Sequence, residues 1–130
     1  MAGKLTPDDV MAAVEEHMGG SFVWGLSDCC SAPCAAFAAL HGIDPMERVR
    51  GTYDDRKGAR RLIQRMGGLR IFAPRLAQDA GLRSGGGVGA IGLIPNGTGF
   101  SLAIGLGDLW AAKADAGFSF VTEVEAAWCV

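Results

Sequence analysis

The pattern of apolar residues changes near Ser84, and this change constrains the fold more than any other feature of the sequence. Before Ser84, apolar residues recur at helical spacing in segments that end at glycine pairs, as at Gly19 and Gly20. After it, short apolar runs alternate with glycine-rich turns, which is typical of a meander of antiparallel strands. The sequence therefore predicts an α+β fold in which N-terminal helices pack on a C-terminal antiparallel β-meander.

Capping residues set the expected boundaries of the helices. Thr6 is a favourable N-cap with Pro7 in the first helical position, which predicts a helix over residues 7–18. Asp28 is placed to cap a second helix over residues 29–41. Two more helices are expected over residues 53–66 and 72–80, and strands over residues 90–94, 100–106, 109–114 and 118–124, with a turn at 95–99.

The size and charge of the chain favour one domain with a mixed surface. Its 130 residues, 49% of them hydrophobic, suffice for a single core, so residues 1–130 are expected to form one domain. Twelve Lys and Arg oppose fourteen Asp and Glu for a net charge of -2. The basic residues of segment 47–65 are interleaved with acidic ones, which argues against binding to nucleic acid or to an anionic membrane.

No segment has the pattern of a membrane span or a secretion signal. No apolar run approaches the roughly 20 residues of a membrane helix, and residues 1–9 lack the apolar centre of a signal peptide. We therefore expect synthesis in the cytoplasm, where thiols are normally reduced, rather than a framework of disulfides.

Three cysteines fall within the stretch GSFVWGLSDCCSAPC, residues 20–34. Cys29 follows the expected helix cap Asp28, and unpaired N–H groups and the helix dipole at such a place stabilise a thiolate. Cys29 is therefore a candidate nucleophile. The alternative is that it fills space in the core, because cysteine is among the most buried residue types.

The cysteines also raise the possibility of a metal site. Cys30 and Cys34 are four residues apart and share a helix face, so both sulfurs are able to bind one metal ion. Cys29 points elsewhere, Cys129 lies near the other end, and the paired C-x-x-C motifs of thiolate sites are absent. Core packing is the favoured interpretation, and we expect no cofactor.

The pattern W-G-x-x-D-C, formed by Trp24, Gly25, Asp28 and Cys29, resembles the short NlpC/P60-like proteins found in tail gene clusters of bacteriophages and gene-transfer agents. Further matching positions are Gly42, Asp44, Arg50, Gly51, Tyr53 and Trp128. The resemblance implies a papain-like fold. It also implies cleavage of peptidoglycan peptides by a helix-start cysteine, a histidine on a central strand and a third polar residue on the next strand.

The sequence departs from this family at the general base. Ser101, in "SLAIGLG", stands where the family histidine is expected, and residues 110–112 offer no third polar group. His41 follows Cys29 by twelve residues on the same expected helix, which puts it roughly 18 Å away. His17 ends the first expected helix, where a cation near the C-terminus is a common stabiliser, and the alternative is that it approaches Cys29 as its base.

Two functions are consistent with these features. The first is a degenerate module, a structural or assembly component of a phage-type tail tip that binds hub or distal tail proteins. It would be made in the host cytoplasm and carried in the virion tail, with Phe22, Trp24, Trp110 and Trp128 as candidate contact residues. The alternative is an active cysteine peptidase or amidase acting on peptidoglycan, with Cys29 as nucleophile and an unconventional base.

Overall fold

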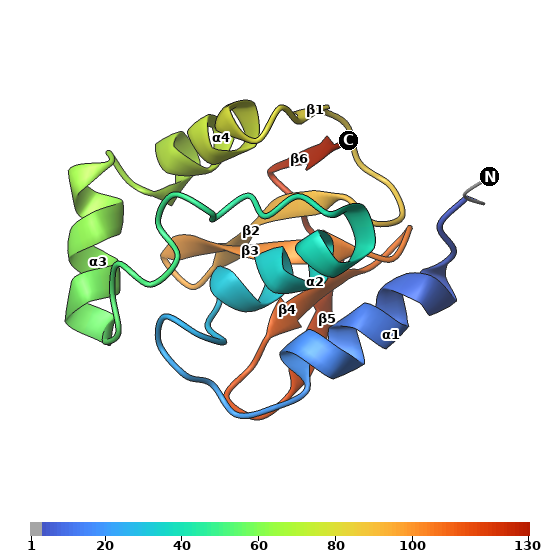
Figure 1. The fold of residues 1–130 in the computed structure, drawn as a ribbon, viewed down its shortest axis with the longest axis horizontal. Helices are drawn as coiled ribbons and strands as arrows, with labels where there is room; N and C mark the ends of the chain where they lie inside the picture. Colours follow the sequence, from blue (N-terminus) through green and yellow to red (C-terminus); the bar gives the residue numbers. More distant parts are fainter. Residues whose placement is uncertain (1–3) are drawn as a thin grey trace.

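The computed structural model describes residues 4–130, which form four helices and six strands in an α+β arrangement (Figure 1). None of the helices in this part of the chain is long and apolar enough to cross a membrane. The elements in chain order are α1 (Pro7–Met18), α2 (Ser31–His41), α3 (Arg56–Arg65), α4 (Leu69–Asp79), β1 (Arg83–Ser84), β2 (Ile91–Asn96), β3 (Gly99–Gly105), β4 (Trp110–Lys113), β5 (Phe118–Val121) and β6 (Ala126–Cys129).

The strands form one antiparallel sheet in the order β1-β6-β2-β3-β4-β5. The meander predicted from the sequence is confirmed for β2 to β5. The predicted turn at 95–99 is too long, because β2 and β3 continue to the pair Asn96 and Gly99 and leave a two-residue turn. The strands β1 and β6 were not predicted, and β6 returns across the sheet to lie between β1 and β2.

The helix boundaries follow the capping chemistry, with some corrections. Thr6 and Asp9 form a reciprocal capping box, so α1 begins as predicted. The second helix begins at Ser31, two residues later than predicted, because Asp28 caps a turn through Cys29 and Cys30 first. The fourth helix begins at Leu69, three residues earlier than predicted. The third is shorter than predicted, since Asp55 is its N-cap.

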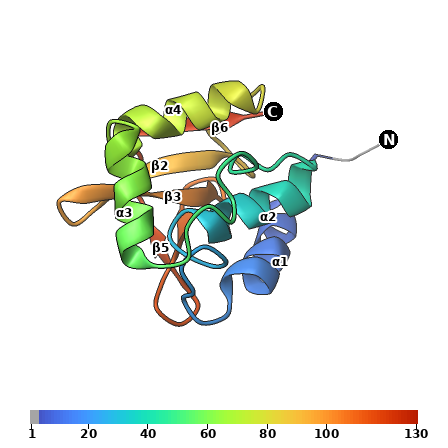
Figure 2. The ribbon, with the colours of Figure 1, turned by 60° about the vertical axis from the view of Figure 1, so that its left-hand side comes forward.

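The main core lies between the sheet and the helices α2 and α4, which cover the same face (Figures 1 and 2). The helix α1 packs against α2 and completes the core with fully buried side chains. This face of the sheet carries Ile91, Leu93, Leu102, Ile104 and Trp128. The start of α2 is therefore held directly against the central strand β3.

The opposite face of the sheet carries a smaller apolar cluster centred on Trp110. The indole ring lies over Gly92 and Gly105, where any Cβ atom would overlap it or press against it. Trp110 and Trp128 are only 5% and 8% exposed. Their prediction as surface contact residues is wrong, because each side chain fills one face of the sheet.

Candidate functional site

The carboxylate of Asp28 organises the start of α2. It is 1% exposed, and its Oδ1 accepts hydrogen bonds from the N–H groups of Cys30 (2.9 Å) and Ser31 (2.8 Å). The Asp28 N–H in turn donates to Ser31 Oγ at 2.8 Å, which completes a reciprocal cap. The prediction of Asp28 as a cap is confirmed, although the capped segment begins with a turn.

The second oxygen of Asp28 accepts hydrogen bonds from the preceding loop and from a distant part of the chain. Oδ2 accepts from the Gly25 N–H at 2.8 Å and from the Tyr53 hydroxyl at 2.6 Å. Burial alone raises the pKa of the carboxyl, but the hydrogen bonds from Ser31, Tyr53 and the other donors outweigh it, so the pKa of Asp28 is lowered. The buried group is thus a fully bonded carboxylate.

Gly25 explains the glycine of the W-G-x-x-D-C pattern. Its φ of 84° favours glycine, and a Cβ at this position would overlap the carbonyl oxygen of Tyr53. The same position donates its N–H to Asp28. The glycine therefore lets segment 53–54 approach the turn closely enough for the Tyr53 hydroxyl to reach the carboxylate.

An ion pair between Asp44 and Arg50 fixes the segment that leads to Tyr53. Arg50 Nε lies 2.6 Å from Asp44 Oδ2, and its Nη2 lies 3.0 Å from Oδ1. The same Nη2 donates to the carbonyl oxygen of Ser31 at 3.3 Å. The guanidinium is half-buried, and its hydrogen bonds to Asp44 raise its pKa. Five of the positions that match the family resemblance thus belong to one polar network, which runs through Ser31: Gly25, Asp28, Asp44, Arg50 and Tyr53.

Cys29 lies at the edge of this network. Its side chain is half-buried, and its carbonyl oxygen accepts from the Leu102 N–H of β3 at 3.3 Å. Hydrogen bonding from the Cys30 thiol lowers the pKa of Cys29, against the opposing effects of burial and the Asp28 charge. The pKa of Cys30 is raised by the same interaction and by burial.

No histidine completes a catalytic pair in the described part of the chain. Around Cys29, the cluster of ligand-type side chains within residues 4–130 contains only Asp28 and Cys30. His41 is at the far end of α2, with its Nε2 2.8 Å from the carbonyl oxygen of Gly89. His17 lies in the last turn of α1 beside Glu16.

Ser101 is buried in β3, but on the wrong face of the sheet to meet Cys29. Side chains alternate along a strand, and Ser101 pairs with Ile94, which belongs to the cluster on the face opposite α2. Its neighbour Leu102 faces α2. No hydrogen bond joins Ser101 to Cys29 within residues 4–130.

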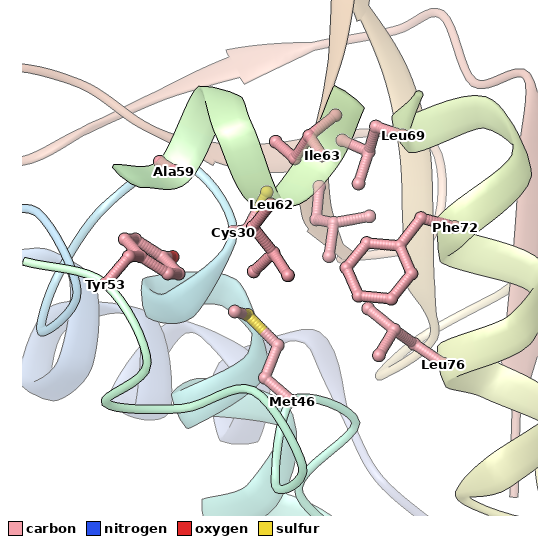
Figure 3. Close-up of a pocket in the computed structure, with 10 residues that line it drawn as sticks. Cys30, Met46, Tyr53, Ala59, Leu62, Ile63, Leu69, Phe72 and Leu76 are labelled. Atoms are coloured by element: carbon pink, nitrogen blue, oxygen red, sulfur yellow. The ribbon is translucent and has the colours of Figure 1, made fainter. Parts of the chain in front are cut away.

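The cavity nearest to this turn is too small for a peptide. It measures about 20 Å³, which is room for one water molecule, and it lies under α3 and α4 (Figure 3). Cys30 lines it, and Cys29 does not. The remaining lining residues, all but Tyr53 apolar, are Met46, Tyr53, Ala59, Leu62, Ile63, Leu69, Phe72, Leu76 and Leu102.

The cysteines do not converge on a four-sulfur site. Ligand atoms of Asp28, Cys29 and Cys30 lie within 4.8 Å of one another, but the carboxylate already accepts four hydrogen bonds. Within residues 4–130, neither Cys34 nor Cys129 joins this group. Cys34 is buried in α2, and burial raises the pKa of its thiol. The geometry favours core packing for Cys34.

Residues 21–26, called here the apolar loop, precede the Asp28 turn. Phe22 and Trp24 are half-buried and pack edge to face, with ring centroids 4.7 Å apart. The sequence analysis missed Val23 and Leu26, which are 44% and 75% exposed. Their exposure could have been expected from the sequence, because the six-residue loop contains four apolar side chains and a tight turn beside the core is too small to bury them all.

The base of the apolar loop is bound to the turn between β4 and β5. The Phe22 N–H donates to the carbonyl oxygen of Asp115 at 2.9 Å. The ammonium group of Lys113 donates to the carbonyl oxygens of Gly20, Ala114 and Gly117. Burial lowers the pKa of Lys113. The loop thus has a fixed base and exposed apolar residues.

The comparisons with known proteins identify a family but no activity. A family described as a domain of unknown function (DUF6950) matches residues 6–130. The chain belongs to this family, and the match covers nearly its whole length, including the Asp28 network and the sheet. No curated protein and no solved structure matches the chain.

Proposed function

We propose that this chain is a papain-like module of the NlpC/P60 type that has lost its catalytic machinery and serves as a structural or assembly component of a phage-type tail tip. The α+β arrangement, with α2 starting against β3, is compatible with that fold. The resemblance in Trp24, Gly25, Asp28 and Cys29 supports the relationship. We further propose hub or distal tail proteins as partners, with synthesis in the host cytoplasm and a final location in the virion tail.

One observation carries the proposal: within residues 4–130, His41 is bound to the carbonyl oxygen of Gly89 and His17 lies beside Glu16, and neither makes a hydrogen bond to the Cys29 thiol. A cysteine peptidase needs a base to take the thiol proton and an acid to protonate the leaving amine, a role that contributes about 10²- to 10⁴-fold. Of the residues that match the family, Gly25 and Tyr53 donate hydrogen bonds to Asp28, and Arg50 pairs with Asp44. They therefore stabilise the fold without supplying that chemistry.

The apolar loop supplies a surface for assembly. Leu26 and Val23 project from a segment whose base is hydrogen-bonded to the β4–β5 turn. Exposed apolar side chains of this kind are typical of contact sites between proteins. Phe22 and Trp24 support the loop from within, so of the four aromatic residues predicted as contacts they remain the candidates.

Co-purification with tail-tip proteins tests the proposal. The chain is mixed with the products of neighbouring genes and separated by gel filtration, and we expect it to elute with a hub or distal tail protein. The variant Val23→Ser/Leu26→Ser should lose this association. The matched control is Ile71→Ser, because Ile71 is 54% exposed on α4 and lies outside the loop. Failure of the unmodified chain to bind any of these proteins would overturn the proposal.

The lowered pKa of Cys29 favours a second candidate, an active cysteine peptidase or amidase that acts on cell-wall peptides. Purified chain is incubated with soluble peptidoglycan fragments, and product formation is compared with that of Cys29→Ala. Hydrolysis that disappears in the variant would support the enzyme. Equal rates for the two proteins would exclude Cys29 as its nucleophile.

A further inference from the structure

Two neighbouring thiols with opposite properties lie at the start of α2. Their sulfur atoms are within 4.8 Å of each other. Cys29 is half-buried, whereas Cys30 is 7% exposed and lines the small cavity under α3 and α4 (Figure 3). One thiol is thus open to a reagent from solvent, and the other is shielded from solvent but within reach of the first.

We propose that Cys29 and Cys30 form a redox-active dithiol that closes reversibly to a disulfide between adjacent residues. The oxidant is a small disulfide of the glutathione class. The inference does not depend on the proposed role in a tail tip, since it concerns only the chemistry of this pair. Because solvent reaches Cys29 more easily than Cys30, Cys29 reacts first with the oxidant and Cys30 reacts second.

The reaction proceeds in two exchange steps. In the first, the Cys29 thiolate attacks one sulfur of glutathione disulfide, a mixed disulfide forms on Cys29, and one glutathione thiolate leaves. In the second, the Cys30 sulfur attacks Cys29 Sγ, the bond between Cys29 and glutathione breaks, and the Cys30 proton passes to the departing glutathione thiolate. Two protein thiols are oxidised, one glutathione disulfide is reduced to two glutathione molecules, and the two protons of the protein thiols end on the two glutathione thiolates.

Closure strains the local backbone, and this strain makes it reversible. Both cysteines lie in the turn before Ser31, outside the regular helix, and the Cys30 side chain borders a cavity of about 20 Å³. Adjacent Cα atoms are about 3.8 Å apart, below the roughly 4.4 Å lower limit of ordinary disulfides. The resulting strain makes the bond easy to reduce.

The other cysteines are poorly placed to compete. Cys34 is fully buried in α2, where burial raises the pKa of its thiol. Cys129 in β6 is half-buried like Cys29, but it is not part of the cluster of Cys29 and Cys30, so it is not placed to form a disulfide with either of them. The structure therefore assigns one oxidisable pair within residues 4–130.

Thiol counting and intact-mass measurement test the proposal on the full chain. After treatment with glutathione disulfide and removal of excess reagent, we expect the four free thiols to fall to two and the mass to fall by two hydrogen atoms. Peptide mapping should place the bond between Cys29 and Cys30, and an excess of reduced glutathione should restore all four thiols. The Cys34→Ser and Cys129→Ser variants should each still lose two thiols.

The Cys30→Ser variant is the critical comparison. It should accumulate a stable adduct of one glutathione on Cys29, because the resolving thiol is missing, while Cys29→Ser should form neither the adduct nor the disulfide. The proposal is overturned if the unmodified chain keeps the glutathione adduct to the same extent as Cys30→Ser, if all four thiols survive treatment, or if the bond maps to Cys129.

Discussion

Under the proposed NlpC/P60 relationship, the turn at Asp28 and the central strand at Ser101 are the counterparts of the two halves of a cysteine peptidase site, and their surroundings differ sharply. The Asp28 carboxylate is buried and accepts four hydrogen bonds from three segments of the chain. Ser101 is also buried, yet it faces away from α2 and makes no hydrogen bond to the turn. Asp28 is thus bound into the fold by its hydrogen bonds, whereas Ser101 takes no part in holding the turn.

The largest effect is expected from Asp28→Ala. It leaves the N–H groups of Gly25, Cys30 and Ser31 and the Tyr53 hydroxyl without their acceptor, and each buried unpaired group costs about 1–3 kcal/mol. Because water reaches some of these groups after the change, we expect the free energy of unfolding to fall by about 4 kcal/mol. Urea denaturation measures it. The control Asp54→Ala, at an exposed position, should change stability by less than about 0.5 kcal/mol.

A smaller loss is expected from Gly25→Ala. The new methyl group would overlap the Tyr53 carbonyl oxygen, and the residue would be held at a φ that favours glycine, so we expect a loss of about 3 kcal/mol. The control is Gly42→Ala at the end of α2, where φ is also positive but nothing lies within 4 Å of the added carbon. Its loss should be about 1 kcal/mol. Equal losses in the two variants would show that the contact with Tyr53 does not matter.

The pH dependence of stability offers a third comparison, through Asp28→Asn. The pKa of Asp28 is lower in the folded state than its ordinary value of about 3.9, so its contribution is present above about pH 4 and is lost as the pH falls through the folded-state value. The stability difference between the unmodified chain and the variant should therefore be constant from about pH 5 to 7 and shrink in acid. Urea midpoints at several pH values test this. A difference that grows on acidification would contradict the assignment.

The smallest effect is expected from Ser101→His, measured as hydrolytic activity on peptidoglycan fragments. Placing at this position the histidine expected from the NlpC/P60 resemblance should produce no Cys29-dependent hydrolysis of peptidoglycan fragments, because the side chain at this position lies on the sheet face opposite α2. Circular dichroism establishes that the variant is folded. Hydrolysis that appears in Ser101→His and disappears in the double variant Cys29→Ala/Ser101→His would show that the strand is able to present the base.

Capping residues, which act locally, made the helices predictable from the sequence. The strand order was harder to predict, because strands pair with partners far away in the chain. The cap at Thr6 fixed α1 correctly, whereas the two-residue error at α2 arose because Asp28 caps a turn before the helix proper. No local signal shows that the last strand crosses to β2, since strand pairing depends on distant partners. Trp110 was misassigned for the same reason, because its burial depends on glycines of β2 and β3.

The site could be predicted in part from the sequence. The cap role of Asp28 followed from its position before an apolar helix, and the serine at position 101 together with the distance of His41 along the expected helix pointed to a missing base. The hydrogen bond between Asp28 and Tyr53 joins residues 25 positions apart in the sequence, and the one between Arg50 and Ser31 joins residues 19 positions apart. Such contacts depend on how segment 44–53 folds back, which propensities and spacing do not reveal.

The ammonium group of Lys113 has a consequence for recognition. By donating to three carbonyl oxygens, it restrains the base of the apolar loop before any encounter. A protein that binds at Leu26 therefore meets a preorganised surface. The loop loses less conformational entropy on association than a flexible loop would. Affinity at such a surface depends mainly on how well the partner's shape matches it.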